Sequence, residues 1–166
     1  MDAQLIELRP WSDDELSILQ QTLGDNAMME HLGGIESCDQ ILARHRRYLV
    51  ASGAGGMFAI FLAPDLRVGT TGFWERTWQG RSVYETGWMI LPEFAARGIA
   101  TEAALAIVQR ARGERRFDSL HAFPSVSNSA SNAVCRKAGF VNLGECAFEY
   151  PKGRVMRCND WTVLLG

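Results

Sequence analysis

The sequence has no apolar run near the length of about 20 residues that a bilayer-spanning helix needs. Its N-terminus also lacks the charged and apolar segments of a secretory signal peptide. The cysteines Cys38, Cys135, Cys146 and Cys158 show neither a paired spacing nor a zinc pattern. We therefore expect a soluble, cytoplasmic protein with reduced thiols.

Motifs of several well-known chemistries are absent as well. The sequence contains no glycine-rich loop that ends in Gly-Lys-Ser or Gly-Lys-Thr, no Gly-x-Ser-x-Gly elbow and no His-Glu-x-x-His. The 3 histidines are scattered, so we predict no metal site. A formal net charge of −2 gives no overall attraction to nucleic acid or to an anionic membrane, and we predict neither as a partner.

What the sequence does contain is an ordinary globular composition, with 47% hydrophobic and 22% charged residues among 166. This length fits one domain, which we place at residues 1–166. Strand and helix patterns are mixed along the chain, which predicts the α+β class with about seven strands and about four helices. The short connections after 57–62 and 68–75 predict that these strands and 81–90 form an antiparallel meander.

The other elements follow from periodicity and from capping residues. Besides the meander, we predict strands at 5–9, 119–124, 146–150 and 155–165. A helix should begin at Asp13 after a Ser12–Glu15 capping box, and another should follow the Ser37–Gln40 capping box. Further helices are predicted at 25–32, at 100–112 with Gly113 as its end, and at 130–137.

The segment 85–104 carries the most specific signal, because an apolar strand runs through a short Arg97-Gly98 turn into an amphipathic helix. The first amides of a helix have no partner within it, and the helix dipole adds positive charge there. Gly98 would let a ligand approach the backbone closely. The turn is therefore a candidate cradle for a diphosphate. Such turns also occur in α/β folds without any ligand role.

A second segment, Asn128-Ser-Ala-Ser131, begins the helix that ends at Gly139-Phe140. Only one predicted strand separates it from the first helix. The two helix N-termini would then lie at the ends of neighbouring parallel strands, with room for an extended ligand between them. The alternative is purely structural, with Ser129 or Ser131 as the helix cap.

Both segments resemble a known family. The sequence Pro92-Glu-Phe-Ala-Ala-Arg-Gly-Ile-Ala-Thr-Glu-Ala103 resembles the acetyl-coenzyme A signature of GNAT-type N-acetyltransferases. Asn128-x-x-Ser131 followed by Lys137-Ala-Gly-Phe140 resembles the second motif of that family. The resemblance covers nearly the whole chain and is greatest to the RimJ/RimL-like branch, the N-terminal acetyltransferases of ribosomal proteins.

The resemblance implies a single-domain GNAT-like fold, whose mostly antiparallel sheet has parallel, splayed fourth and fifth strands. It implies transfer of an acetyl group from acetyl-CoA to a primary amine, by direct attack in a ternary complex. The amine would belong to a protein N-terminus or to a small molecule. Dimers are common among similar proteins, so a homodimer is left open.

The resemblance also implies which residues bind acetyl-CoA. The pantetheine arm would lie along the strand edge at Trp88, Met89, Ile90 and Leu91, and the diphosphate would lie on Arg97, Gly98, Ile99, Ala100 and Thr101. Asn128 and Ser131 match positions that face the pantetheine and the thiol, and Lys137 belongs to the same binding set.

For catalysis, Glu85 is our candidate base, acting through water, because it shares a strand face with Gly87 and Met89. The alternative is that Glu85 pairs with a surface arginine. The backbone amide of Met89 or Ile90 would bind the developing oxyanion. Ser131 is our candidate acid, with a helix-cap role as the alternative.

Two departures from the family pattern keep further alternatives open. Ala95 replaces a frequent Gln or Arg, and Cys135 replaces a Tyr that protonates the leaving thiolate in many members. Cys135 could take that role or be a buried thiol, and His121 could be a base or a structural residue. A catalytically silent acyl-CoA sensor is thus a second hypothesis, and a hydrolase that uses Cys135 with His121 is a third.

Overall fold

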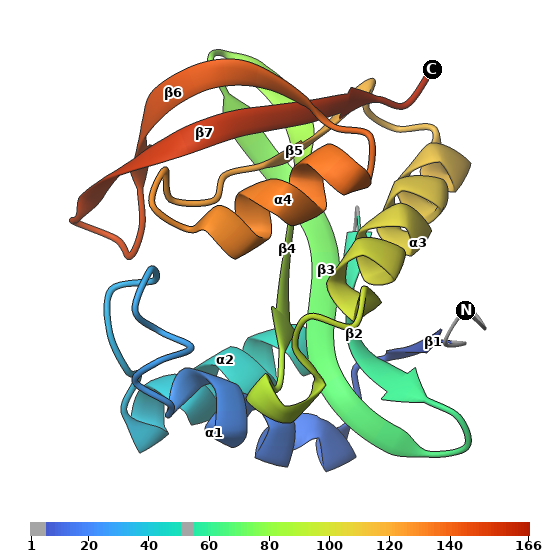
Figure 1. Ribbon diagram of the computed structural model, residues 1–166, viewed down its shortest axis with the longest axis vertical. Coiled ribbons are helices and arrows are strands. Elements are labelled where there is room, and N and C mark those ends of the chain that lie inside the picture. Colours follow the sequence, from blue (N-terminus) through green and yellow to red (C-terminus); the bar gives the residue numbers. More distant parts are fainter. Residues whose placement is uncertain (1–5, 51–54) are drawn as a thin grey trace.

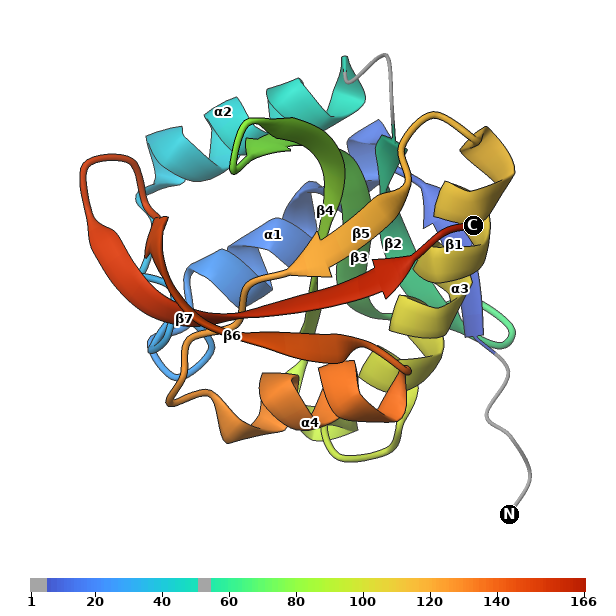
Figure 2. The same cartoon turned by 90° about the horizontal axis from the view of Figure 1, so that it is seen from above.

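The computed structural model describes residues 6–50 and 55–166. They form a seven-stranded sheet with the strand order β1-β2-β3-β4-β5-β7-β6. Helices α1 and α2 cover one face of this sheet, and α3 and α4 cover the other (Figures 1 and 2). The α+β class that the sequence predicts is confirmed.

All neighbouring strands are antiparallel except β4 and β5, which are parallel. The meander β2–β3–β4 is confirmed, since each of its connections is short enough for a hairpin. The strands are β1 (Ile6–Pro10), β2 (Gly55–Leu62), β3 (Leu66–Trp78), β4 (Arg81–Ile90), β5 (Ser119–Ala122), β6 (Val141–Glu149) and β7 (Val155–Leu164). The predicted first strand begins at Leu5, which lies outside the described residues.

The helices are α1 (Leu16–Leu23), α2 (Cys38–Leu49), α3 (Ile99–Glu114) and α4 (Ser129–Lys137), with 3-10 turns η1 (Asp13–Glu15) and η2 (Pro92–Phe94). The main core lies between the sheet and the α3 and α4 layer, and a smaller core joins α1 and α2 to Met89 of β4. None of these helices is long and apolar enough to cross a membrane.

Three local predictions are wrong. Residues 25–32 form hydrogen-bonded turns instead of a helix, because the Asp25 carboxylate accepts the amide of Met28 and Gly33 and Gly34 follow with positive φ. Gly113 does not end α3, which continues to Glu114. The Glu114 carboxylate accepts hydrogen bonds from Tyr84 and from the amide of Gly55, so tertiary contacts hold the last turn in place.

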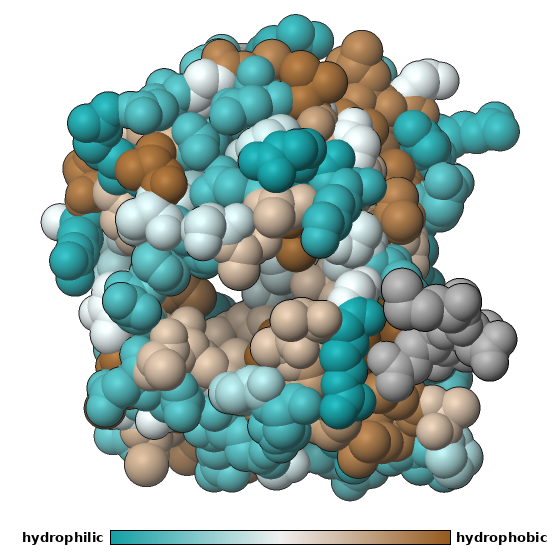
Figure 3. Space-filling model, viewed as in Figure 1, coloured by the Kyte–Doolittle hydropathy of each residue, from teal (hydrophilic) through white to brown (hydrophobic). Residues whose placement is uncertain are grey.

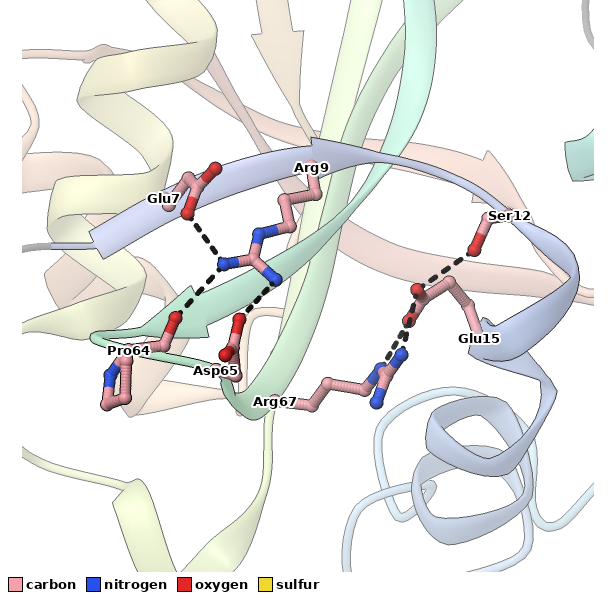
Figure 4. Close-up of polar contacts among 7 residues, drawn as sticks. All are labelled: Glu7, Arg9, Ser12, Glu15, Pro64, Asp65 and Arg67. Atoms are coloured by element: carbon pink, nitrogen blue, oxygen red, sulfur yellow. Dashed lines mark hydrogen bonds and ion pairs between the residues drawn. The ribbon is translucent and has the colours of Figure 1, made fainter.

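The third wrong prediction is the capping box at Ser12. Ser12 makes no side-chain cap, and the segment begins as the 3-10 turn η1. Its partner Glu15 turns inward instead and binds Arg67 of β3 at 2.7 Å (Figure 4). Arg9 makes a separate set of contacts with Glu7 and Asp65 in the same region. This end of the sheet is therefore tied to η1 by charge pairs, whereas the Ser37–Gln40 capping box of α2 forms as predicted.

Candidate functional site

The parallel strands β4 and β5 pair over only two registered positions, Tyr84 with Leu120 and Glu85 with His121. Beyond Glu85, β4 continues to Ile90 on β3 alone, while β5 ends at Ala122. The strands thus separate at Glu85. Figure 3 shows the surface hollowed between the part of the molecule that holds α4 and the part that holds α1.

Hydrogen bonding to β3 fixes which amides of β4 face the open side. The amide of Leu91 donates to the Val68 carbonyl at 2.8 Å, so Leu91 points toward β3. Backbone groups alternate sides along an antiparallel strand. The amide of Met89 therefore also faces β3, and those of Trp88 and Ile90 face away from it. Of the two amides predicted as the oxyanion donor, only that of Ile90 lies on the open side, and the choice of Met89 is corrected.

The N-terminus of α3 follows β4 through η2 and has no side-chain cap among the described residues. Gly98 precedes the helix with a φ of +82°, a conformation that disfavours any residue with a side chain. A Cβ added to Gly98 would meet no described atom within 4 Å. Helix geometry leaves the amides of Ile99, Ala100 and Thr101 without intrahelical partners. The partial positive charge of the helix dipole therefore lies at an open backbone turn.

Helices α2 and α4 contrast with α3, whereas α1, which continues η1, also has no side-chain cap. Ser37 caps α2, and Asn128 caps α4 by accepting the amide of Ser131 at 3.1 Å. The predicted caps Ser129 and Ser131 are therefore wrong, because the side chain of Asn128, the residue before the helix, takes the capping role. Ser131 lies half-buried in the first turn of α4.

The remaining predicted binding residues differ in placement. Arg97 is exposed, with its guanidinium 5.4 Å from the ring centroid of Phe94. The side chains of Trp88 and Ile90 pack on the core beside α3. Lys137 is exposed in the last turn of α4, about 12 Å along the helix from its first residue. It lies at the opposite end of α4 from Asn128.

Glu85 lies on the sheet face opposite α3, and its side chain is 12% exposed. Its Oε2 atom accepts two hydrogen bonds, from Arg76 Nη1 at 2.8 Å and from Trp74 Nε1 at 3.1 Å. The pairing with an arginine that the structural alternative expects is thus present. Burial raises the pKa of Glu85, while Arg76, Trp74 and His121 oppose that rise.

The second oxygen of Glu85 is in a different state. Within the described part of the chain, no group donates a hydrogen bond to Oε1. The one fully buried side-chain atom without a partner in that part is Nε of Arg76. Oε1 is therefore not fully buried, and the carboxylate keeps one oxygen without a hydrogen-bond donor.

His121 is the neighbour of Glu85 on β5 and forms a buried pair with Asp160, with Nδ1 2.6 Å from Oδ1. Its Nε2 lies 3.2 Å from the Ser119 hydroxyl oxygen, toward the start of β5. Phe123 stacks on the other side of the ring, with centroids 5.7 Å apart. The imidazole therefore points away from the end at which β4 and β5 separate.

Cys135 is fully buried in the core under α4, together with Leu120 and Ala122. Burial raises the pKa of this thiol to about 12. His121 alternates with those two strand residues, so it faces the opposite side of the sheet. The structure does not bring Cys135 and His121 together, which removes the hydrolase hypothesis.

Three residues at the site were not predicted from the sequence: Trp74, Arg76 and Asn132. The first two contact Glu85, and Asn132 of α4 binds the Asn159 and Trp161 side chains of β7. The register Trp74–Glu85, set by the hairpin turn at Gln79–Gly80, was the signal that could have identified the contact.

A wall of loops closes one side of the hollow. The loop between α1 and α2 reaches toward the β6–β7 hairpin (Figure 1). His31 of this loop contacts the connection between β5 and α4, where its Nδ1 lies 3.2 Å from the Ser127 hydroxyl oxygen. Arg44 of α2, paired with Glu36, lies 3.4 Å from the hydroxyl of Tyr150. Segments distant in sequence thus meet around the face that Glu85 occupies.

Residues 6–141 match the family model described as the acetyltransferase (GNAT) domain. No curated protein matches the chain. A GNAT-family acetyltransferase from Bacillus anthracis has a similar structure, with a TM-score of 0.81, 20% identity and coverage of 99% of this chain and 98% of that one.

Two further solved structures are similar at the same level. Spermidine N-acetyltransferase from Vibrio cholerae, in complex with CoA and spermine, has a TM-score of 0.79 at 18% identity, and the match covers 96% of this chain and 95% of that one. An acetyltransferase from Salmonella typhimurium that modifies the N-terminal serine of a ribosomal protein has a TM-score of 0.79 at 19% identity, with coverage of 98% and 96%. At these identities the likeness shows the fold.

Proposed function

This chain belongs to the GNAT acetyltransferase family, and from that premise we propose that it transfers an acetyl group from acetyl-CoA to a primary amine, with Glu85 as the base. The observation that carries the proposal is the uncapped N-terminus of α3, which lies at the end of a strand that has left its parallel neighbour. An amine acceptor agrees with what the spermidine enzyme and the Salmonella enzyme act on.

The residues at this end of the sheet fit acetyl-CoA. The open turn at Gly98 and the unpaired amides of Ile99, Ala100 and Thr101 suit a diphosphate. The outward-facing groups of Trp88 and Ile90 suit an extended amide chain that adds to the strand edge. When bound, acetyl-CoA supplies an activated thioester.

The remaining chemistry belongs to the protein. The acceptor ammonium must lose a proton, and the unpaired Oε1 of Glu85 accepts it, directly or through water. The nitrogen then attacks the carbonyl carbon, and the amide of Ile90 donates a hydrogen bond to the oxygen that gains charge. The thiolate leaves and takes a proton from Ser131, and the second proton that the nitrogen loses on becoming an amide restores the Ser131 hydroxyl. The buried, weakly acidic Cys135 has no part in this scheme.

Several finer points belong to the same proposal. Asn128 keeps a role beside the pantetheine through its side-chain NH2 group, since capping uses only its oxygen. Lys137 is retained as a weaker contact at the far end of α4. We also propose one domain over residues 1–166, a cytoplasmic location with no nucleic acid or membrane partner, and either a monomer or a homodimer.

The proposal is tested by steady-state release of the CoA thiol from acetyl-CoA with a panel of amines. The panel should include a peptide N-terminus, a polyamine and an aminoglycoside. Turnover with at least one amine supports an acetyltransferase. Tight binding of acetyl-CoA without turnover on the whole panel would instead support the silent sensor.

The placement of the diphosphate is tested by Gly98→Glu, which adds bulk, backbone strain and negative charge at the open turn. We expect acetyl-CoA affinity to fall by at least about 100-fold, since a like charge replaces a site for an anion. The matched control is Gly139→Glu, because Gly139 has a φ of +84° and the same open surroundings. Calorimetry that finds unchanged affinity in a folded Gly98→Glu variant would contradict the placement.

A further inference from the structure

Arg76 is held in a single orientation beside Glu85. Its Nη1 donates to Glu85 Oε2 at 2.8 Å, and its guanidinium carbon lies 4.2 Å from the ring centroid of Phe148. An arginine that binds a carboxylate and also stacks on an aromatic face has little rotational freedom. Its Nε atom is buried and has no hydrogen-bond partner among residues 6–50 and 55–166. The position of this cation therefore carries the free-energy cost of one unpaired buried polar atom.

Trp74 approaches the same oxygen from the next position of the same strand face. Its Nε1 donates to Oε2 at 3.1 Å. Its ring lies over Gly87, since a Cβ added there would meet the indole at 3.6 Å. Two donors from β3 therefore hold one oxygen of the carboxylate and none holds the other.

We propose that Arg76 is a positioning residue for Glu85: it binds Oε2, keeps the carboxylate charged and turns Oε1 outward as the oxygen that accepts the proton of the acceptor amine. This inference rests on the proposed role of Glu85 as the base. It adds a residue that acts through Glu85 and does not touch the reacting atoms.

The other groups around Glu85 do not replace Arg76. His121 of β5 is its registered neighbour, but Nδ1 of that ring already pairs with Asp160 of β7. Cys158 of β7 is a buried thiol whose pKa is raised to about 11. Arg76 is thus the permanent cation beside Glu85. Without it, burial would raise the pKa of Glu85 further.

The test is the pH dependence of kcat/KM in Arg76→Met and Arg76→Lys. The acid limb reports protonation of the base, and loss of a neighbouring opposite charge shifts a pKa by about one to three units. We expect the acid limb of Arg76→Met to move upward by about one pH unit or more. Arg76→Lys should move less, because it restores the charge without the stacked, planar group.

The matched control is Arg67→Met. Arg67 is also on β3, also pairs with a glutamate and also lies near a phenylalanine ring, but it is at the other end of the strand from Arg76. The acid limb of the kcat/KM profile of Arg67→Met should coincide with that of the wild type. An equal shift in both variants would show a general loss of structure and overturn the inference.

A measurement without turnover separates this inference from the proposed function. Carbon-13 NMR of the glutamate carboxyl groups, with Glu85→Gln to assign the signal, gives the titration midpoint of Glu85 directly. A midpoint that rises in Arg76→Met supports the inference even if no amine is acetylated, which would refute only the proposed function. A midpoint that stays the same would overturn the positioning role, whatever the activity.

Discussion

Two arginines of β3, Arg67 and Arg76, each pair with a glutamate, and the two pairs use the carboxylate differently. At one end, both oxygens of Glu15 are occupied, since Arg67 binds Oε2 at 2.7 Å and Ser12 binds Oε1 at 3.1 Å (Figure 4). At the other end, both donors to Glu85 bind Oε2. A carboxylate with both oxygens engaged can only hold structure, whereas one with a free oxygen can still accept a proton.

The surroundings of the two pairs are otherwise alike. Arg67 lies 5.1 Å from the ring centroid of Phe61, and Arg76 lies 4.2 Å from that of Phe148. Both glutamates are mostly buried, with exposed fractions of 4% for Glu15 and 12% for Glu85. An ion pair at a candidate site is therefore no argument against catalysis. The distribution of donors between the two oxygens is the informative feature.

The largest expected difference between the pairs is in turnover. Glu85→Gln should lower kcat/KM by about 100-fold or more, the usual contribution of a positioned base, while the affinity for acetyl-CoA stays the same. Glu15→Gln should leave turnover within about twofold, because Glu15 binds Ser12 and Arg67, which have no part in the proposed mechanism. Steady-state kinetics and calorimetry on both variants check this. Wild-type rates in Glu85→Gln would return the base role to water alone or to His121.

The second difference is in stability. Arg67→Met leaves the Glu15 carboxylate buried with only Ser12 as a donor, and it should lower the free energy of unfolding by about 2 kcal/mol. The side chain of Arg67 is 37% exposed, so water compensates part of the loss. Urea denaturation at neutral pH measures the effect. No change in the midpoint would mean that the pair contributes as little as an ordinary surface ion pair.

The smallest expected effect is a pH dependence of stability that Glu85 alone provides. Its pKa is raised in the folded state, so the folded protein binds this proton more tightly than the unfolded chain. That contribution is fully present below the ordinary pKa of glutamate and is lost as the pH rises through the folded-state value.

The unfolding free energy of the wild type minus that of Glu85→Gln should therefore fall as the pH rises above the ordinary pKa of glutamate. Urea titrations across this range at constant ionic strength provide the measurement. A difference that instead grows with pH would mean that Arg76 outweighs burial at this carboxylate.

Much of the fold could be predicted because local patterns and tertiary structure agree. The meander follows from apolar runs with short turns, and α3 follows from small and branched residues at helical spacing that face the core, such as Ala104, Ile107 and Ala111. The uncapped end of α3 lies at the turn that the sequence predicts. It could be predicted because the choice of Gly98 depends only on backbone properties.

What could not be predicted depends on contacts between distant residues. The orientation of the Met89 amide depends on which residues of β4 form hydrogen bonds to β3, and the hydrophobic pattern of the sequence does not show this. The turns at 25–32 contain residues that favour helix, but the Asp25 carboxylate and two glycines decide otherwise. The register of the β3–β4 hairpin places the donors Trp74 and Arg76 beside Glu85. The residues around Glu85 in the sequence do not indicate these contacts.

Asn132 exhausts its hydrogen-bonding capacity inside the protein. Its NH2 group donates to the carbonyls of Ser125 and Asn128, and its oxygen accepts from Asn159 and Trp161. No other side chain has this shape and this set of donors and acceptors, so evolution would have little freedom to replace it. Related chains could thus retain an asparagine within an apparent ligand-binding motif for architecture alone, and its persistence in an alignment would be no mark of a ligand contact.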